Sequence, residues 1–124
     1  MRYFITKRFN KYLKDEKLKR ISLREVIKDI IAGNTVSLGK KLFKTRMKAS
    51  GKGRSGGYRT LTYYKVKEKI IFIALLVKSE RENFTKTELK ALKLYAVELD
   101  KLKDKEIDSL LMNNAFIELH FNVE

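Results

Sequence analysis

One segment of this chain, from Ile31 to Lys67, contains ten lysine and arginine residues and no aspartate or glutamate. The flanking parts are more mixed: residues 1–29 carry ten basic and four acidic side chains, and residues 68–124 carry nine basic and eleven acidic ones. Like charges gathered in this way repel one another and weaken a folded state unless something acidic outside the chain covers them. The segment must therefore fold into a charged surface, and RNA is the first candidate to cover it.

The composition is that of a folded protein. The chain has 124 residues, 44% of them hydrophobic, which suits one domain over residues 1–124 that removes about two thirds of its unfolded surface from water. The absence of cysteine excludes disulfides, thiol zinc sites and thiol nucleophiles. The longest apolar run, Ile70–Val77, is far shorter than the roughly 20 residues of a membrane helix. We therefore expect a soluble, cytoplasmic protein without a signal peptide.

Helices are expected near both ends of the chain. Apolar residues recur at helical spacing within Lys7–Leu18 and again within Leu23–Ile31. Ser22 and Thr85 are each followed three residues later by glutamate, which is the spacing of a capping box at a helix start. The second box predicts a helix that runs to about Lys103, and a shorter helix is expected after it.

Five strands are expected, three from a residue period of two and two from aromatic or β-branched composition. These segments are Met1–Ile5, Lys41–Lys48, Tyr58–Val66, Ile70–Val77 and Phe116–Val123. The fourth is an unbroken β-branched and aromatic run, which is typical of a strand covered on both faces, so we expect it at the centre of the sheet. The first is expected at an edge.

The first basic strand carries a row of three cations. Lys44, Arg46 and Lys48 alternate along it and should project from one face about 7 Å apart, a spacing that resembles successive phosphates. If the following loop closes a hairpin, one register places Arg59 opposite Lys48. The same register places Tyr63 opposite Lys44, so that a phenol joins the cations. The alternative is a solvated face without a partner, although such faces usually mix both charge signs.

The glycine-rich loop GKGRSGG adds Lys52 and Arg54 to this surface. Glycine loops can hold phosphate through backbone amides, and we expect these two side chains, together with Lys41, to help bind it. The loop lacks the G-x-x-x-x-G-K-[ST] spacing of a nucleotide-binding loop and precedes a strand instead of a helix. A plain hairpin connection is the alternative interpretation.

Three further residues are candidates for proton transfer or phosphate contact. Glu80 and Arg81 follow the expected central strand directly, where functional residues often collect; a purely structural ion pair is the alternative. His120 is the single histidine, which excludes a two-histidine ribonuclease mechanism and a histidine-cluster metal site. Its place on the polar side of the last expected strand makes a surface role the simpler interpretation.

Two segments resemble toxins of the RelE/ParE superfamily, in particular the RelE/HigB-like toxins of type II toxin–antitoxin systems. They are KTRMKASGKGRSGGYRT and, after the apolar strand, VKSERENFTKTELKAL, and the similarity is continuous over about residues 38–95. The resemblance implies an α+β fold, a small twisted antiparallel sheet with two N-terminal helices and one or two C-terminal helices packed on it. It also implies a ribosome-dependent endoribonuclease, an mRNA interferase that inhibits translation.

Such toxins generally use no metal and no small-molecule cofactor. The ribose 2′-OH attacks the adjacent phosphorus, so the site needs a proton acceptor, cations around the phosphorane and a proton donor. By motif, the resemblance implies that Lys44 and Arg46 contact the scissile phosphate and that Arg59 stabilises the transition state. Lys78 matches the lysine that ends the central strand, and Lys48 serves as an auxiliary cation.

The chain departs from better-known members at two places. Ser79 stands where they have a second arginine, and Phe84 stands where they have a tyrosine. Arg81 is expected to take up part of that arginine's work, and Tyr63 or His120 to replace the tyrosine. The assignment of the general base and the general acid therefore stays open.

Two classes of function fit the sequence. The first is the ribosome-dependent nuclease, with the ribosome and mRNA as partners. The second is a basic protein without catalysis, either a gyrase inhibitor of the ParE kind or an RNA-binding module. Both imply a cognate antitoxin, expected to be a helix-turn-helix protein, and neither implies a membrane. Primer extension separates them, because only the nuclease gives cuts in phase with codons.

Overall fold

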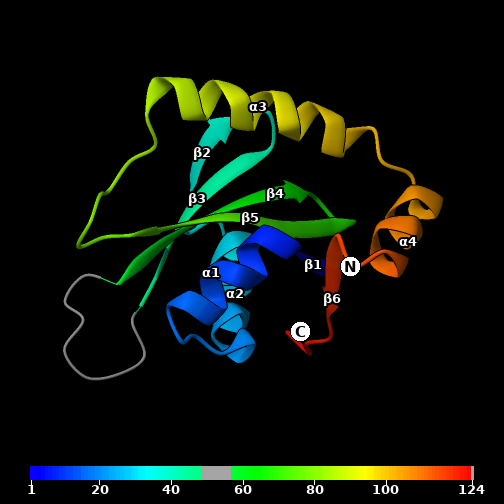
Figure 1. Cartoon of the computed structure of the whole chain (residues 1–124), viewed down its shortest axis with the longest axis horizontal. Coiled ribbons are helices and arrows are strands. Elements are labelled where there is room, and N and C mark those ends of the chain that lie inside the picture. Colours follow the sequence, from blue (N-terminus) through cyan, green and yellow to red (C-terminus); the bar gives the residue numbers. More distant parts are fainter. Residues whose placement is uncertain (49–56, 124) are drawn as a thin grey trace.

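The computed structural model describes residues 1–48 and 57–123 (Figure 1). Within these residues the chain forms one six-stranded sheet with the order β2-β3-β4-β5-β1-β6. The strands are β1 (Arg2–Thr6), β2 (Val36–Gly39), β3 (Leu42–Met47), β4 (Tyr58–Lys65), β5 (Lys69–Val77) and β6 (Phe116–Leu119). The sheet is mixed, because β1 runs parallel to β5 while the other neighbouring strands pair antiparallel.

The strand β5 lies at the centre of the sheet, as its apolar run predicts, with β4 on one side and β1 on the other. The strand β1 does not lie at an edge, contrary to the prediction. Its outer side is paired by β6, which returns from the C-terminal part of the chain. An aromatic strand with an open edge invites association with other chains, and the pairing with β6 removes that edge.

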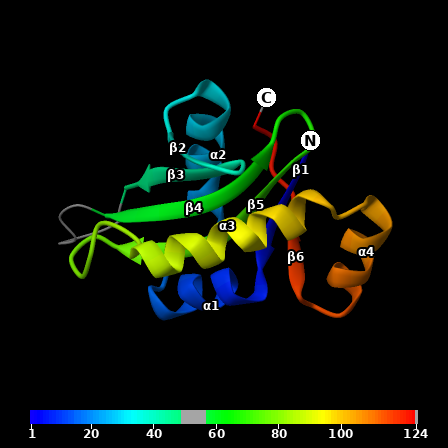
Figure 2. The same cartoon turned by 90° about the horizontal axis from the view of Figure 1, so that it is seen from above.

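Helices cover both faces of the sheet, which gives the predicted α+β fold (Figures 1 and 2). One face carries α1 (Lys7–Asp15) and α2 (Leu23–Ala32), with the 3-10 turn η1 (Arg20–Ser22) between them, and the other carries α3 (Lys86–Asp100) and α4 (Asp104–Met112). No helix in the described part of the chain is long and apolar enough to cross a membrane.

Each face of the sheet has its own apolar core, because successive strand residues point in opposite directions. Phe72 of β5 packs in the cluster that contains Phe9 and Leu23 from the N-terminal helices. Its neighbour Ile71 packs in the cluster that contains Leu99 and Ile107 from the C-terminal helices. The two-sided burial of β5 therefore explains why its sequence is an unbroken apolar run.

Side-chain hydrogen bonds cap the starts of two helices. The hydroxyl of Thr6 accepts a 3.0 Å hydrogen bond from the backbone N–H of Phe9, which caps α1. Thr85 and Glu88 form the predicted reciprocal capping box at the start of α3. The capping box predicted at Ser22 is wrong: Ser22 has helical backbone angles and no side-chain capping bond, because η1 runs directly into α2.

The first helix is shorter than its apolar pattern predicts. It ends at Asp15, and Lys17 takes a left-handed conformation with φ of 55°. The backbone N–H of Leu18 then bonds to the carbonyl of Leu13 at 2.8 Å, which closes the helix end. Leu18 thus packs at the edge of the core as part of the turn and not as part of the helix.

Candidate nucleic-acid interface

The four cations predicted as catalytic lie on β3, on β4 and directly after the end of β5. Arg46 on β3 is directly opposite Arg59 on β4, and Arg59 is opposite Leu76 on β5. Opposite residues, and alternate residues along one strand, share a face of the sheet. Lys44 therefore lies on the face of Arg46, and Lys78, two positions beyond Leu76, lies on the face of Arg59. We refer to these four cations as the cationic face.

The register of the β3–β4 hairpin differs from the predicted one by two residues. Arg59 pairs with Arg46 and not with Lys48, and Lys44 pairs with Leu61. Because the period of a strand is two, a shift of two residues keeps every side chain on its original face. The predicted grouping of Lys44, Arg46 and Arg59 therefore holds even though the predicted pairs are wrong.

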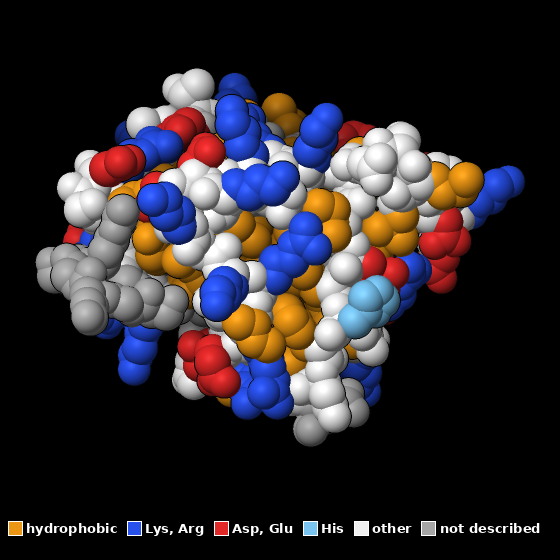
Figure 3. All heavy atoms as spheres, turned by 60° about the horizontal axis from the view of Figure 1, so that its bottom comes forward, with side chains coloured by type: hydrophobic (Ala, Val, Ile, Leu, Met, Phe, Trp, Pro, Cys, Tyr) orange, Lys and Arg blue, Asp and Glu red, His pale blue; other side chains and the backbone are white. Residues whose placement is uncertain are grey.

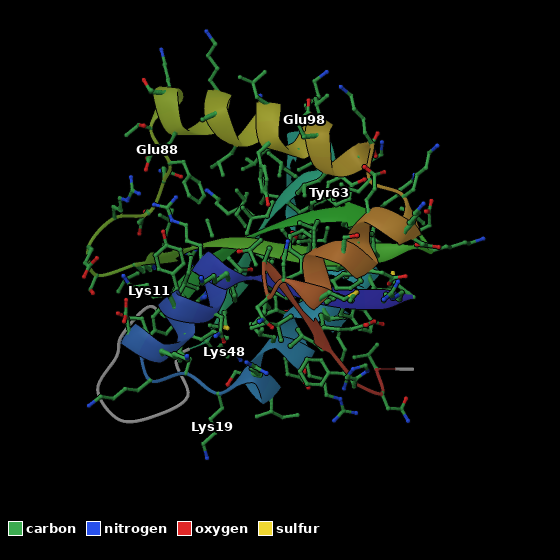
Figure 4. The ribbon with its side chains drawn as sticks, turned by 45° about the vertical axis from the view of Figure 1, so that its right-hand side comes forward. Lys11, Lys19, Lys48, Tyr63, Glu88 and Glu98 are labelled. Carbon is green, nitrogen blue, oxygen red and sulfur yellow. The ribbon has the colours of Figure 1, made fainter. Side chains whose placement is uncertain are left out.

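Lys48 is separated from the other cations because β3 ends at Met47. Together with Arg46, it lines a hollow of about 440 Å³ against α2, to which Glu25 and Asp29 contribute carboxylates. Figure 4 shows Lys48 below the sheet, beside the N-terminal helices. The predicted row of three cations is thus a pair on one face and a third residue at the strand's end.

Arg46 and Arg59 are direct cross-strand partners, so two arginines stand side by side in the β3–β4 hairpin. Arg46 is exposed and Arg59 is half-buried. Among the described residues no carboxylate lies within ion-pairing distance of either guanidinium; Arg59 only donates a 3.3 Å bond to the carbonyl of its neighbour Tyr58. Like charges directly opposite each other destabilise a sheet, and a bound anion removes that repulsion.

Positive charge also extends beyond the cationic face. Figure 3 shows the side of the molecule that carries α1 and α2, where Lys and Arg side chains are spread over an apolar background. The whole chain has a formal net charge of +14. A large net positive charge draws a polyanion toward the protein from a distance.

A loop after β5 reaches back across the sheet to the cationic face. The ammonium of Lys44 donates a 2.8 Å hydrogen bond to the side-chain oxygen of Asn83 on this loop. Asn83 was not among the predicted site residues. The one feature of the sequence that could have pointed to Asn83 is its place in the segment VKSERENFTKTELKAL, shortly before the capping Thr85. The contact holds the Lys44 amine at a defined position above the strands.

Lys78 begins the same loop and is half-buried. Its backbone N–H bonds to the carbonyl of Gly57 at 3.1 Å, so the β4–β5 ladder continues one step beyond β5. Its ammonium lies 3.7 Å from a carboxylate oxygen of Glu82, a loose pair between partly exposed groups that solvent weakens. Lys78 is therefore held by its backbone, while its side chain is only loosely engaged.

Arg81, predicted to contact phosphate, is bonded to a carboxylate in the structure. Its guanidinium donates to both oxygens of Glu88, at 2.5 and 2.7 Å, and Glu88 also accepts from the backbone N–H of Thr85. These bonds, chiefly the one from Arg81, lower the pKa of Glu88 to about 2. Arg81 thus fastens the loop to the start of α3, as in the alternative of a structural ion pair.

Tyr63 and Lys41 also lie away from the cationic face. Tyr63 is fully buried, and its hydroxyl donates to Asp100 of α3; Figure 4 shows its side chain between β4 and that helix. Burial and then this bond raise the pKa of Tyr63. Lys41 lies 3.0 Å from the same Asp100 oxygen. In the structure both residues bond to Asp100 of α3, and their RNA contacts stay a prediction.

His120 lies at the far side of the sheet. It follows β6, and β5 and β1 stand between β6 and the strand that carries Arg59. The residue is exposed (pale blue in Figure 3), and its charge helps, after the bond from Arg2, to lower the pKa of Glu118. The structure thus keeps His120 apart from the cationic face, and this position favours the surface role.

The remaining predicted residues are less constrained. Glu80 is exposed and lies on the loop after β5, between the site residues Lys78 and Asn83. Lys52, Arg54 and the glycine-rich loop lie outside the described residues. Within residues 1–48 and 57–123, the structure gathers no group of three His, Cys, Asp or Glu side chains suited to a metal ion.

Comparison with known proteins identifies one family. A family model described as the RelE toxin of the RelE / RelB toxin-antitoxin system matches residues 1–119 of the chain. No curated protein matches it. The match includes the N-terminal helices, the cationic face, the loop with Asn83 and the C-terminal helices. It therefore covers every element described above.

Proposed function

Because the chain belongs to the RelE toxin family, we propose that it is a ribosome-dependent endoribonuclease that cleaves mRNA and is neutralised by a cognate antitoxin. The observation that carries this proposal is the direct cross-strand opposition of Arg46 and Arg59 without a carboxylate partner among the described residues. Two arginines at directly opposite positions can both turn toward one phosphate, and a bound phosphate offsets their mutual repulsion.

The proposed reaction is an internal transfer at phosphorus. The ribose 2′-oxygen forms a bond to the adjacent phosphorus while the bond to the 5′-oxygen breaks. A base takes the proton of the 2′-hydroxyl, and an acid delivers a proton to the departing 5′-oxygen. The products are a 2′,3′-cyclic phosphate and a 5′-hydroxyl, and neither a redox partner nor a further reactant is consumed.

The cationic face supplies the electrostatic part of this reaction. The phosphorane carries more negative charge on its equatorial oxygens than the ground-state phosphate, and fixed donors aimed at those oxygens favour it. We assign this role to Arg46 and Arg59. Proton transfer is assigned to the groups beside them, namely Lys44, Lys78 and Glu80. The 2.8 Å bond of Lys44 to Asn83 supports its place among these groups.

The test is to map the 5′ ends of messages after brief induction of the toxin. The wild type should give new ends in phase with codons, and the fragments should carry a 5′-hydroxyl and a cyclic phosphate. Arg59→Ala and Arg46→Ala should each reduce cleavage by about a hundredfold or more, as removal of one transition-state donor does in other enzymes. Both proteins should keep the wild-type circular dichroism spectrum.

Arg20 provides a matched control. It is an exposed arginine of η1 with one long contact, 3.2 Å, to Asn10, and Arg20→Ala should cleave as the wild type does. Cuts out of phase with codons, or full cleavage by Arg46→Ala and Arg59→Ala, would contradict the proposal. Growth arrest without cleaved messages would instead favour the non-catalytic alternative, a gyrase inhibitor or an RNA-binding module.

A further inference from the structure

A groove with a volume of about 510 Å³ lies between α1 and α3, beside the cationic face. It exists because β1 is shorter than β5. The pairing of β1 with β5 covers Lys69–Phe72, and then the chain turns into α1. Beyond that point a helix and not a strand flanks β5, so Ile73–Leu76 form the floor of the groove. Figure 2 shows α1 and α3 along this side of the sheet.

Three aromatic side chains from three different elements line this groove. They are Tyr12 of α1, Phe84 of the loop after β5 and Tyr95 of α3. Tyr95 is 38% exposed, and the other two are half-buried. The ring pairs found among the described residues involve other aromatics. Tyr12 and Phe84 also pack against the apolar cores, and the guanidinium of Arg81 lies 6.0 Å from the centroid of the Phe84 ring. Tyr95 is therefore the ring most open to stack on a planar ligand.

The charge around the groove suits a polyanion. Arg8 of α1 and Arg81 of the loop line it as well. The acidic residue in the lining is Glu88, and both of its oxygens accept bonds from Arg81, so its charge is balanced within the groove. A segment of RNA therefore meets aromatic rings and the cation of Arg8 here, without an uncompensated carboxylate.

The groove is continuous with the cationic face. Its floor residue Leu76 is the cross-strand partner of Arg59, which puts the two backbones about 5 Å apart. The loop after β5 joins the two sites as well, because Asn83 contacts Lys44 while the next residue, Phe84, lines the groove. A ligand with a phosphate at Arg59 can thus place its adjacent apolar part in the groove.

We propose that the groove between α1 and α3 binds an unpaired nucleobase of the RNA whose backbone lies on the cationic face. This inference rests on the proposed function only in taking RNA as the ligand of that face. Unstacked bases bind to proteins by stacking on aromatic rings and arginine planes, which is the lining found here. A segment of a partner protein is the other conceivable occupant, and the test below separates the two.

The test compares two short single-stranded RNAs of equal length and charge, one complete and one with a base removed at an internal position, by fluorescence anisotropy. Wild type should bind the complete RNA about 5- to 150-fold more tightly, the range for one stacked base. Tyr95→Ala should bring this ratio close to one and leave the affinity for the abasic RNA unchanged. Leu94→Ala, an exposed neighbour on α3 outside the groove lining, should keep the ratio.

A second variant tests the groove independently, in case Tyr95→Ala does not fold. Ala91 is exposed and lines the groove, so Ala91→Leu fills the space without removing any packed atom and should lower the ratio too. Arg59→Ala should weaken both RNAs alike, because it removes a phosphate contact. A preference for the complete RNA without any cleavage of messages would contradict the proposed nuclease function but support the proposal for the groove. Three outcomes would overturn the groove proposal: equal affinity of the wild type for both RNAs, no binding of either RNA, or an equal loss in Tyr95→Ala and Leu94→Ala. Equal affinity is the outcome expected if a partner protein occupies the groove.

Discussion

The ammonium of Lys44 lies 2.8 Å from the side-chain oxygen of Asn83, although 39 positions separate the two residues in the chain. The contact joins β3 to the loop after β5 and therefore passes over β4, which stands between the two strands. The loop is itself fastened to α3 by the bonds between Arg81 and Glu88. The position of the Lys44 amine is thus set by a chain of contacts that ends on a helix.

The first prediction is that Asn83→Ala reduces cleavage while leaving the protein folded. The variant keeps Lys44 but frees its amine to leave the cationic face, and a displaced group commonly costs between about tenfold and a hundredfold in rate. Asn83 is exposed, so the free energy of unfolding should change little. Cleavage of a translated message measures the effect. Wild-type cleavage by Asn83→Ala would show that the contact does not position Lys44.

The second prediction concerns the opposed arginines. Arg46→Gln should raise the free energy of unfolding at low salt by several tenths of a kcal/mol, up to about 1 kcal/mol, because it removes a like-charge pair across two strands. The gain should shrink at high salt, where exposed charges are screened. The same variant should lose cleavage. Urea unfolding at two salt concentrations measures the stability, and a destabilised Arg46→Gln would mean that the two guanidiniums do not repel.

Much of the fold follows from local patterns in the sequence. The apolar run Ile70–Val77 identifies the central strand, because a strand without polar residues is stable only where both of its faces are covered. Thr85 and Glu88 predict the start of α3, since their capping bonds depend on residues three positions apart. In the same way, alternation alone places Lys44 and Arg46 on one face.

Other features depend on partners distant in the chain. The hairpin register depends on how the connection between β3 and β4 is built, and the alternation pattern is unchanged by a shift of two. The pattern therefore predicts the face of Arg59 but not its partner. The burial of Tyr63 depends on the approach of α3, whose Asp100 lies 37 positions away. Neither the period of β4 nor its composition contains that information.

The loop after β5 is the clearest case of a feature that the sequence leaves open. Arg81 and Glu88 are seven positions apart, too far for contact within one helical turn, and they meet because the loop bends back before α3 begins. Once Arg81 is bound in this way, its charge is no longer offered to phosphate. The bend also brings Asn83 to Lys44, so the same turn withdraws one predicted residue and adds an unpredicted one.

The third prediction is that Tyr63→Phe lowers stability and leaves cleavage intact. The buried hydroxyl of Tyr63 donates to Asp100, which also pairs with Lys41. Loss of one hydrogen bond to a charged acceptor should cost about 1–2 kcal/mol, while the ring still fills the core. Urea unfolding and message cleavage measure the two effects. A stable but inactive Tyr63→Phe would return Tyr63 to the functional site.

The last prediction is a pH dependence that originates at Glu88. Its pKa in the folded protein is lowered to about 2, first by the bond from Arg81, whereas an unfolded glutamate has a pKa of about 4.3. Because the folded value is the lower one, the stabilising contribution is complete above about pH 5 and is lost as the pH falls toward 2.

Carboxyl carbon NMR of the folded protein should therefore show Glu88 titrating near pH 2, and Arg81→Gln should move its midpoint up toward 4. Glu88→Gln should flatten the fall in stability across the same window. Glu98→Gln serves as the control, because Glu98 forms an exposed pair with Lys101 at the end of the same helix and has no part in the loop.

Since Glu88 and Arg81 are partly exposed, solvent weakens their contribution to stability, and the NMR midpoint is the decisive measurement. An unchanged midpoint in Arg81→Gln would mean that the loop is not fastened through this pair, and the position of Asn83 beside Lys44 would then need another cause.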